Sequence, residues 1–437
     1  TLGGSIRFDG SDLFGVDKKY RYLPLYSVSG LWRISQEPFM ANAKWIDNLV
    51  VRASYGLQGN IDKNTSPYLL GNYRIENILP GGSEDMIDVS GAPNKKLRWE
   101  KTHSVNAGFD FAVLNQAINL SVDYYYRKGV DLIGTQMLPL ETGFEMLTVN
   151  WASMQNQGVE VALSTRNIHT KNFMWTTNFN FAYNNNKILK EALREDALEP
   201  GREGYPVGAL FALKTAGLDE EGYPMFEGKD GKAVSAMEFF KLQEWGFGAT
   251  DLTARERREL YTYVGTADCP YTGGFNNTFT YKAFELGVNF SFDFGGKVRS
   301  QPTYSIVDFD KGRNTNRDIL NRWTPENTET IFPVLLSQNE RLDEYMWYSN
   351  QNEIYRNLDI WIRDLNYVRL QNIRLGYTLP TNFSRKLGMT SATIAIEGRN
   401  LLVFGSSYKN YLDPETMSNA YATPAPKSVT LSLNLNF

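Results

Sequence analysis

The chain has 437 residues, a formal net charge of −4 at pH 7 and a hydrophobic fraction of 42%. That length fits two or three soluble domains or one large barrel, and a near-neutral balance without basic clusters argues against a nucleic-acid partner. No run of about 18 or more apolar residues occurs, which excludes a protein that crosses a membrane with helices. Cys269 is the only cysteine, so there is no disulfide framework and no thiolate metal site.

Segments in which apolar and polar residues alternate recur along the whole chain. Because side chains alternate across a strand, this period of two predicts strands with one apolar and one polar face. After a strand-like opening at Thr1, the apolar sets of the first half are Tyr26, Val28, Trp32 and Ile34; Leu49, Val51, Ala53, Tyr55 and Leu57; Val105, Ala107, Phe109 and Phe111; Ile118, Leu120, Val122, Tyr124 and Tyr126; Val159, Val161 and Leu163; and Phe173, Trp175, Phe179, Phe181 and Tyr183.

The second half continues the pattern. Its apolar sets are Phe275, Phe279 and Tyr281; Leu286, Val288, Phe290, Phe292 and Phe294; Ile373, Leu375, Tyr377 and Leu379; Ala392, Ile394 and Ile396; and Val429, Leu431, Leu433, Leu435 and Phe437. We count roughly twelve strands in all, which predicts an all-β protein.

Charged residues such as Arg52, Asp123 and Asp293 fall on the polar faces of these strands. A water-filled lumen tolerates such charges, whereas a charge on a lipid face near the bilayer midplane costs roughly 2–4 kcal/mol. We therefore predict a transmembrane antiparallel β-barrel. The apolar sets, Leu286 and Phe290 among them, should face lipid, and the polar sets should line the lumen.

The connections between the predicted strands alternate in length. Short turns are predicted near residues 36–45, 113–116, 167–172, 283–284 and 380–390, and long loops near 59–96, 131–154, 187–270, 297–365 and 405–426. Short turns on one side and long extracellular loops on the other are typical of an outer-membrane barrel. A soluble β-sandwich shares the alternation within strands but has no reason to sort its loops in this way.

The longest predicted loop, 187–270, should contain structure of its own, because unstructured loops of that size are rare. Residues 217–222 read as the turn of a small hairpin. Thr253 and Glu256 form a capping box that should open a helix running from Ala254 to about Tyr261. A single helical turn is expected just before Gly388.

The last strand, residues 427–437, ends on an aromatic residue with no polar tail after it. Its length of about ten residues suits a transmembrane barrel strand. We predict that its apolar residues form the assembly signal for insertion into the outer membrane: Leu433, Leu435 and Phe437.

Motifs for catalysis or for a cofactor are not found in the sequence. There is no G-x-S-x-G, Walker or G-x-G-x-x-G sequence, and the only histidines are His103, within a strand, and His169, in a turn. We expect no enzyme activity, no cofactor and no metal site.

Aromatic residues in the long loops are the candidates for contact with a partner. Exposed aromatic rings stack on sugars, grip peptides or anchor protein interfaces, although they also pack loops together. The candidates for an interface with a partner protein are Trp245, Trp323, Trp347 and Tyr348. The residues that contact substrate are not assigned.

In this arrangement the sequence resembles the C-terminal half of the SusC/RagA family of TonB-dependent outer-membrane transporters from Bacteroidota. The resemblance rests on a series of stretches in family order: IRFDGSDLFG, LYSVSGLWRISQEPFM, LVVRASYGLQGN, LRWEKTHSVNAGFDF, NQAINLSVDYYYRKGVDLI, NQGVEVALSTRNI, YTGGFNNTFTYKAFELGVNFSF, NRWTPEN, YVRLQNIRLGYTLP, IAIEGRNLLVF, YLDPE and the terminal strand.

The resemblance implies a 22-stranded barrel, of which residues 1–437 would supply about twelve C-terminal strands. The N-terminal half of the barrel, the plug domain and the segment that contacts TonB are expected to lie in a preceding portion of the protein. The implied partners are therefore that N-terminal half, TonB, the lipid bilayer and a SusD-like surface lipoprotein that forms a lid.

The implied function is energised import of oligosaccharides or oligopeptides across the outer membrane. A surface adhesion or scaffolding protein anchored by its barrel, and a passive pore, are the alternatives. An upstream plug and TonB-contacting segment would favour import over both.

Overall fold

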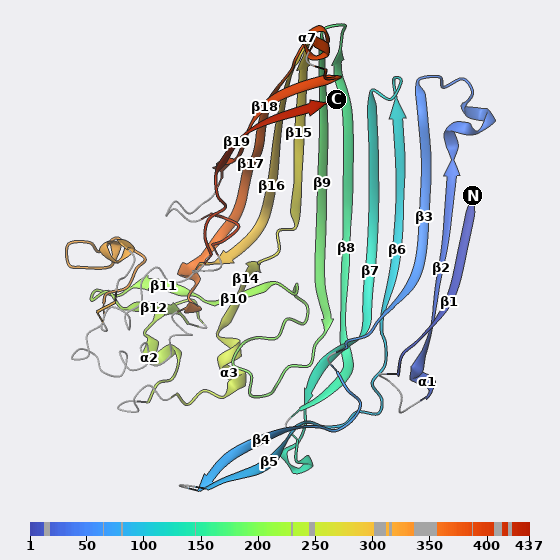
Figure 1. Ribbon diagram of the computed structural model, residues 1–437. Coiled ribbons are helices and arrows are strands. Elements are labelled where there is room, and N and C mark those ends of the chain that lie inside the picture. Colours follow the sequence, from blue (N-terminus) through green and yellow to red (C-terminus); the bar gives the residue numbers. More distant parts are fainter. Residues whose placement is uncertain are drawn as a thin grey trace.

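The computed structural model describes residues 1–12, 18–63, 65–79, 82–144, 146–228, 230–243, 250–300, 312–313, 317–335, 356–386, 388–405, 413–417 and 422–437. Over these residues the chain is dominated by one antiparallel sheet of twelve strands (Figure 1). In sheet order the strands are β1 (Leu2–Gly10), β2 (Tyr22–Arg33), β3 (Ile46–Asn60), β6 (Glu100–Val113), β7 (Ile118–Met137), β8 (Met146–His169), β9 (Phe173–Lys190), β15 (Tyr271–Tyr281), β16 (Phe284–Arg299), β17 (Ile362–Thr378), β18 (Ser391–Phe404) and β19 (Ser428–Asn436). The predicted all-β class and the strand count are confirmed.

Short connections gather at one end of the sheet, at the top of Figure 1. There β2 and β3 are joined through the 3-10 turns η2 (Ile34–Gln36) and η3 (Pro38–Met40), and β17 and β18 through the helix α7 (Thr381–Lys386). Between β6 and β7 the tight turn places Leu114, Asn115 and Gln116 in the left-handed backbone region. The predicted short turns are confirmed at this end of the sheet.

Long connections leave the opposite end of the sheet and carry the remaining elements (Figure 1). The elements there are α1 (Lys18–Arg21), the hairpin β4 (Leu70–Leu79) and β5 (Gly82–Gly91), η4 (Leu140–Thr142), β10 (Ala209–Leu213), β11 (Thr215–Leu218), β12 (Pro224–Glu227), β13 (Ala233–Val234), α2 (Ala236–Phe239), α3 (Ala254–Glu259), β14 (Tyr261–Thr266), η5 (Arg317–Asn321) and η6 (Asp359–Trp361). No helix in the described residues is long and apolar enough to span a membrane.

One predicted long loop is wrong. Strands β7 and β8 continue through most of residues 131–154, so their connection covers only residues 138–145. The ladder shifts register around Gly129 and Leu132, and Asp131 takes a positive φ of 57°. This bulge breaks the alternation of apolar and polar residues, and the sequence pattern therefore hides the continuing strands.

The local structure of the long connections follows the predicted turn and cap chemistry. The Asp219 side chain accepts hydrogen bonds from the backbone N–H groups of Glu221 (2.9 Å) and Tyr223 (2.8 Å), which closes the β11–β12 hairpin. The capping box is present: the Thr253 hydroxyl accepts from the Glu256 N–H while the Glu256 carboxylate accepts from the Thr253 N–H. Helix α3 ends at Glu259, two residues earlier than predicted, because Tyr261 begins strand β14.

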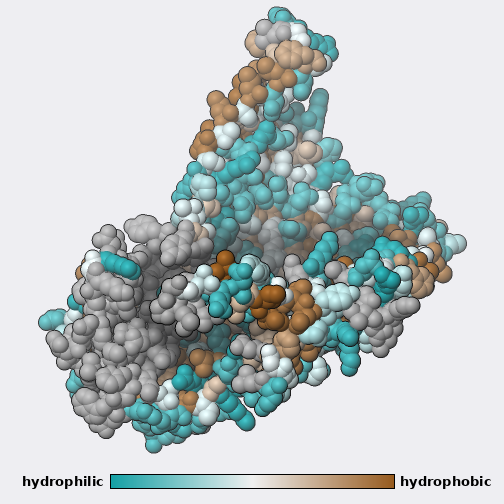
Figure 2. Space-filling view, turned by 60° about the horizontal axis from the view of Figure 1, so that its bottom comes forward, coloured by the Kyte–Doolittle hydropathy of each residue, from teal (hydrophilic) through white to brown (hydrophobic). Residues whose placement is uncertain are grey.

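The register places the apolar sets opposite one another across the sheet. Val51 lies opposite Phe109, which lies opposite Val122 and so on along the ladder. Leu286 lies opposite both Phe279 and Leu375, so the second half of the sheet has the same continuous apolar face. In Figure 2, hydrophilic residues cover the hollow of the curved sheet and hydrophobic residues follow its outer edge. The apolar face is therefore the outer face, as predicted.

Candidate functional site

A row of short, uncharged polar side chains crosses the inner face of the sheet near its short-turn end. Its members lie directly opposite one another on successive strands, with Ala112 of β6 between the first two: Asn48, Asn119, Ser164, Asn178, Asn276, Asn289 and Asn372. Neighbouring strands lie about 4.8 Å apart. We call this set the amide row.

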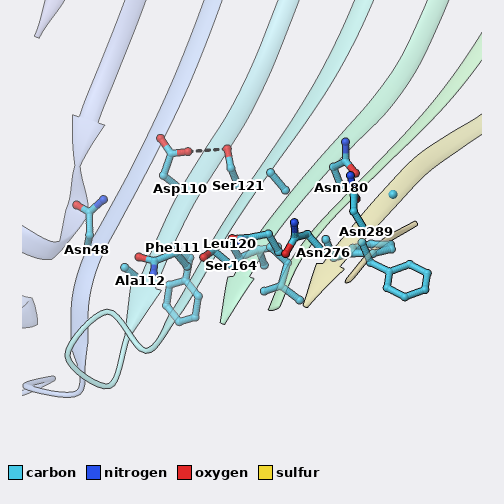
Figure 3. Close-up of a pocket in the computed structure, with 17 residues that line it drawn as sticks. Asn48, Asp110, Phe111, Ala112, Leu120, Ser121, Ser164, Asn180, Asn276 and Asn289 are labelled. Carbon is cyan, nitrogen blue, oxygen red and sulfur yellow. Dashed lines mark hydrogen bonds between the residues drawn. The ribbon is translucent and has the colours of Figure 1, made fainter. Parts of the chain in front are cut away.

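A pocket of about 460 Å³ lies over the amide row (Figure 3). The hollow exists because small residues, Ala112, Ala162 and Gly274, stand among the asparagines on the same wall. Each asparagine carries a carbonyl acceptor and two N–H donors. The wall can thus bond both donors and acceptors of a neutral, hydrated ligand. The one charged residue in the pocket lining, Asp110, is paired with Arg52, so its charge is largely balanced.

A charge cluster lies on the same wall, one and two rows away from the amide row. The Arg52 guanidinium of β3 pairs with Asp110 of β6 and with Asp123 of β7. The Ser121 hydroxyl, on β7, donates to the Asp110 carboxylate at 2.7 Å. All three charged side chains are between 21% and 37% exposed, so the cluster faces the lumen while it links three adjacent strands. Arg52 and Asp123 were predicted to lie on the polar, inner face of the sheet, and they do.

A second ion-pair network fixes part of the β18–β19 connection against the inner wall. Arg369 of β17, which is 1% exposed, pairs with Asp413 and donates from Nε to Glu415 at 2.8 Å. Met417 is also buried, at 3% exposure. Residues 413–417, which we call the inner strap, therefore lie against the wall inside the curve of the sheet. The β18–β19 connection therefore turns toward the inner face of the sheet at residues 413–417.

The β9–β15 and β16–β17 connections together form a lobe with its own hydrophobic core, at the lower left of Figure 1. We call it the loop lobe. Its fully buried side chains include Phe226, Leu358 and Trp361. Leu213 of β10 forms a parallel bridge with Leu358, and its N–H donates to the Asn357 carbonyl at 2.8 Å. Two connections far apart in sequence thus make one packed unit.

Trp323, the one predicted lid-interface residue within the described part of the chain, lies in this lobe. It is half-buried, and its ring covers the Gly222 backbone, which has a positive φ of 86°. The neighbouring chain is fixed by hydrogen bonds from Trp323 N–H to the Phe332 carbonyl (3.0 Å) and from Val334 N–H to the Gly222 carbonyl (3.0 Å). Trp323 therefore helps to join the two connections of the lobe. The other predicted residues, Trp245, Trp347 and Tyr348, lie outside the described residues.

The predicted assembly-signal residues lie on the outer face of β19. Leu433, Leu435 and Phe437 are 59%, 42% and 84% exposed. Strand β19 pairs with β18 and is the last strand of the described sheet. Their role as an assembly signal stays a prediction.

The sequence reasoning missed the amide row and the inner strap. Alternation predicts which residues lie on the polar face of each strand, but the alignment of the asparagines across strands depends on a register that no single strand specifies. The strap pairs Arg369 with residues more than 40 positions away. Among the described residues, no group of three or more His, Cys, Asp and Glu side chains could hold a metal ion.

Comparison with known proteins gives consistent results. Residues 1–210 match a family model described as TonB dependent receptor-like, beta-barrel. TonB-dependent receptor P3 of Formosa agariphila is 28% identical and aligns with 99% of this chain and 43% of its own length. TonB-dependent receptor SusC of Bacteroides thetaiotaomicron is 25% identical and aligns with 99% of this chain and 41% of its own length.

The fold matches a solved structure over the whole chain. The structure of the RagAB peptide transporter superposes with a TM-score of 0.76 at 23% identity, covering 100% of this chain and 46% of that one. The chain thus spans less than half the length of the relatives and structures that it matches.

Alternating faces, the twelve-stranded antiparallel sheet and these matches define an outer-membrane β-barrel that is similar to the barrels of TonB-dependent receptors. SusC of Bacteroides thetaiotaomicron and the RagAB peptide transporter are among the proteins to which the chain is similar.

Proposed function

We propose that this chain forms the C-terminal part of the wall of a transporter that imports oligosaccharides or oligopeptides in an energised, TonB-dependent way. The amide row and its pocket carry this proposal. Apart from the paired Asp110, the wall consists of neutral donors and acceptors, which hold a hydrated ligand by exchangeable hydrogen bonds, each worth about 0.5–1.5 kcal/mol net. Such bonds orient a ligand yet release it, as transport requires.

The proposal includes a barrel larger than the described sheet. Strands β1 and β19 each have only one neighbour among the described strands, so each leaves one backbone edge unpaired. Unpaired edges are costly within a membrane, where water cannot satisfy the N–H and C=O groups. We infer that further strands outside residues 1–437 complete a barrel of 22 strands, and that TonB acts through that portion.

A SusD-like lipoprotein is the proposed partner on the extracellular side. The loop lobe supports this, because it is a folded unit with its own core rather than a set of simple connections. The loop tryptophans, Trp323 among them, remain the predicted anchors of the interface. Similarity to SusC and to the RagAB peptide transporter supports this choice of partner.

Uptake by cells tests the import proposal. Cells that produce the full-length protein should take up labelled oligosaccharides or oligopeptides. Replacing Asn178 and Asn276 together with leucine should lower the rate at least about tenfold, since two hydrogen-bonding groups of the wall are lost. Phe279→Leu, on the outer face of β15 and outside the pocket lining, is the control and should leave uptake unchanged. Uptake that persists after collapse of the proton gradient would instead indicate a passive pore.

Co-purification tests the lid. The lipoprotein should co-purify with the full-length protein from detergent-solubilised outer membranes. It should be lost when both connections of the loop lobe are shortened, whereas shortening the β4–β5 hairpin is the control. Full co-purification without the lobe would mean that the lipoprotein binds elsewhere on the protein. Absence of uptake in the cell assay would instead support an adhesion or scaffolding role.

A further inference from the structure

A small pocket at the base of the loop lobe is separate from the pocket over the amide row. Its volume is about 170 Å³, enough for one carboxylated sugar ring or one amino-acid residue. It lies between β10, β14, the last residue of β16 and the loop that contains residues 199–202. Its polar lining consists of Glu199, Arg202, Tyr261, Arg299 and Asn357.

Arg299 is the central cation of this pocket. Its guanidinium donates from one Nη to the Arg356 carbonyl at 2.8 Å and from the other to the Phe211 carbonyl. Both acceptors are neutral, and no carboxylate among the described residues forms an ion pair with Arg299. Because a guanidinium carries five N–H donors, several remain for a ligand.

The end of strand β16 holds Arg299 in place. The next residue, Ser300, is 2% exposed, and both its backbone N–H and its hydroxyl donate to the Trp361 carbonyl at 2.9 Å. On the opposite side, the Asn357 side chain donates to the Tyr261 hydroxyl at 3.3 Å. The guanidinium is thus held by the core of the lobe rather than by a mobile surface.

The charges of the lining select the ligand. Arg202 and Arg299 contribute two positive charges and Glu199 one negative charge, so the pocket has a net single positive charge. A planar guanidinium fixed in this way matches the two oxygens of a carboxylate. We propose that this pocket binds the carboxylate of an acidic ligand, either a uronic-acid residue of an oligosaccharide or the C-terminus of an oligopeptide.

This proposal deepens the proposed import function, because it adds a recognition site for acidic substrates beside the entrance of the barrel. Binding can nevertheless be measured without transport. The full-length protein in detergent is titrated calorimetrically with trigalacturonic acid and its methyl ester, and with trialanine and its amide. One free acid should bind at least about tenfold more tightly than its neutral derivative, because charge-assisted hydrogen bonds are lost in the latter. The acid that binds identifies the source of the carboxylate.

Variants of the lining test the assignment. Arg299→Ala should weaken binding of that acid at least about tenfold, and Arg299→Lys by less. Because Arg299 also bonds to backbone carbonyls, its substitution could disturb the lobe itself. Substitutions of the exposed residues Arg202 and Glu199 test the pocket while leaving the lobe intact. Arg202→Ala should weaken binding, whereas Glu199→Gln should tighten it about two- to fivefold by removing a like charge.

The opposite signs expected for Arg202→Ala and Glu199→Gln would not arise from a structural role alone. Equal affinity for acids and their neutral derivatives, or no change in either of these two variants, would overturn the proposal. If an acid binds as described but is not taken up by cells, the pocket is supported and the import proposal fails. If cells take up the acid, but the Arg299→Ala and Arg202→Ala variants bind it and take it up as well as the wild type does, the pocket proposal fails alone.

Discussion

Arg369 shows how a single side chain fixes the course of a long connection. It is 1% exposed on β17 and bonds to both Asp413 and Glu415 of the inner strap. Of these two carboxylates, Asp413 is only 7% exposed. Glu415 is 44% exposed, so the buried charges are those of Arg369 and Asp413. Burying these two charges is tolerated because they pair with each other, and removing Arg369 leaves the Asp413 carboxylate uncompensated.

Arg369→Met should therefore destabilise the folded protein by roughly 3–5 kcal/mol and release the strap from the wall. The measurement is the midpoint of urea unfolding together with protease cleavage within residues 405–427. Arg399→Ala is the matched control: Arg399 also pairs with a carboxylate, that of Glu397, but its side chain is 61% exposed. Its loss should cost less than about 1 kcal/mol. Equal effects of the two substitutions would contradict the assigned burial.

At the scale of elements, the stability of helix α3 should decrease at acid pH. The N–H and hydroxyl of Thr253 and the ammonium of Lys241 hydrogen-bond to Glu256 and lower its pKa from 4.5 to about 2. A lowered pKa in the folded state means that the stabilisation is complete above about pH 4.5 and is lost as the pH falls toward 2. The protection factors of the amides of residues 253–260, which are corrected for the intrinsic pH dependence of exchange, should fall over that range. In Glu256→Gln these protection factors should be nearly independent of pH there, and a pH response equal to wild type would exclude Glu256 as its origin.

The packing of Trp323 on Gly222 gives a second prediction for the loop lobe. Gly222 has a φ of 86°, and a Cβ there would overlap the Trp323 ring. Gly222→Ala should therefore both strain the backbone and displace the Trp323 ring. This displacement should break the contact between the two connections of the lobe. Gly231→Ala is the control, because Gly231 has a similar φ of 76° but open space where a Cβ would lie. It should show only the backbone cost of roughly 1–2 kcal/mol.

Tryptophan fluorescence and protease resistance of the lobe measure this difference. A red shift and faster cleavage are expected for Gly222→Ala beyond those for Gly231→Ala. Indistinguishable variants would mean that the Trp323 contact contributes nothing to the lobe.

The elements differ in how far the sequence predicts them. Strands such as β3 and β16 follow from strict alternation, and the capping box of Thr253 follows from local chemistry, because both depend on residues close in the chain. The extension of β7 and β8 beyond Asp131 was missed, since a bulge interrupts the pattern there. The lobe core joins Leu213 to Leu358, and the strap joins Asp413 to Arg369. Contacts between such distant positions leave no periodic signal.

At the scale of the whole molecule, the unpaired edges of β1 and β19 in the described sheet predict that these two strands are not neighbours in the full-length barrel. In a protein with Cys269→Ser, cysteines at Ala395 and Ser432 should be joined by a short thiol cross-linker, because these residues lie directly opposite on β18 and β19. Cysteines at Ser5 of β1 and Ser432 should not react with each other in the full-length protein, since further strands should separate them. Cross-linking of the second pair would instead show a closed twelve-stranded barrel.

Assembly of the whole barrel should depend on its last strand. Deleting Phe437, which is 84% exposed on the outer face, should lower the folded, surface-exposed amount of protein without stopping synthesis. Asn434→Ser, on the polar set of the same strand, is the control and should assemble normally. Surface labelling and heat-modifiable gel mobility measure both. Normal insertion without Phe437 would mean that the signal lies elsewhere.

The amide row also has a consequence for motion. Its side chains repeat with the strand spacing of about 4.8 Å, so a ligand meets a series of similar hydrogen-bonding positions around the wall. The field of an amide dipole fades within a few ångströms, unlike that of an ion. We expect a hydrated solute to diffuse laterally along this wall from strand to strand, because each step exchanges one amide hydrogen bond for the next over a low barrier. We also expect its rate of diffusion there to be nearly independent of ionic strength.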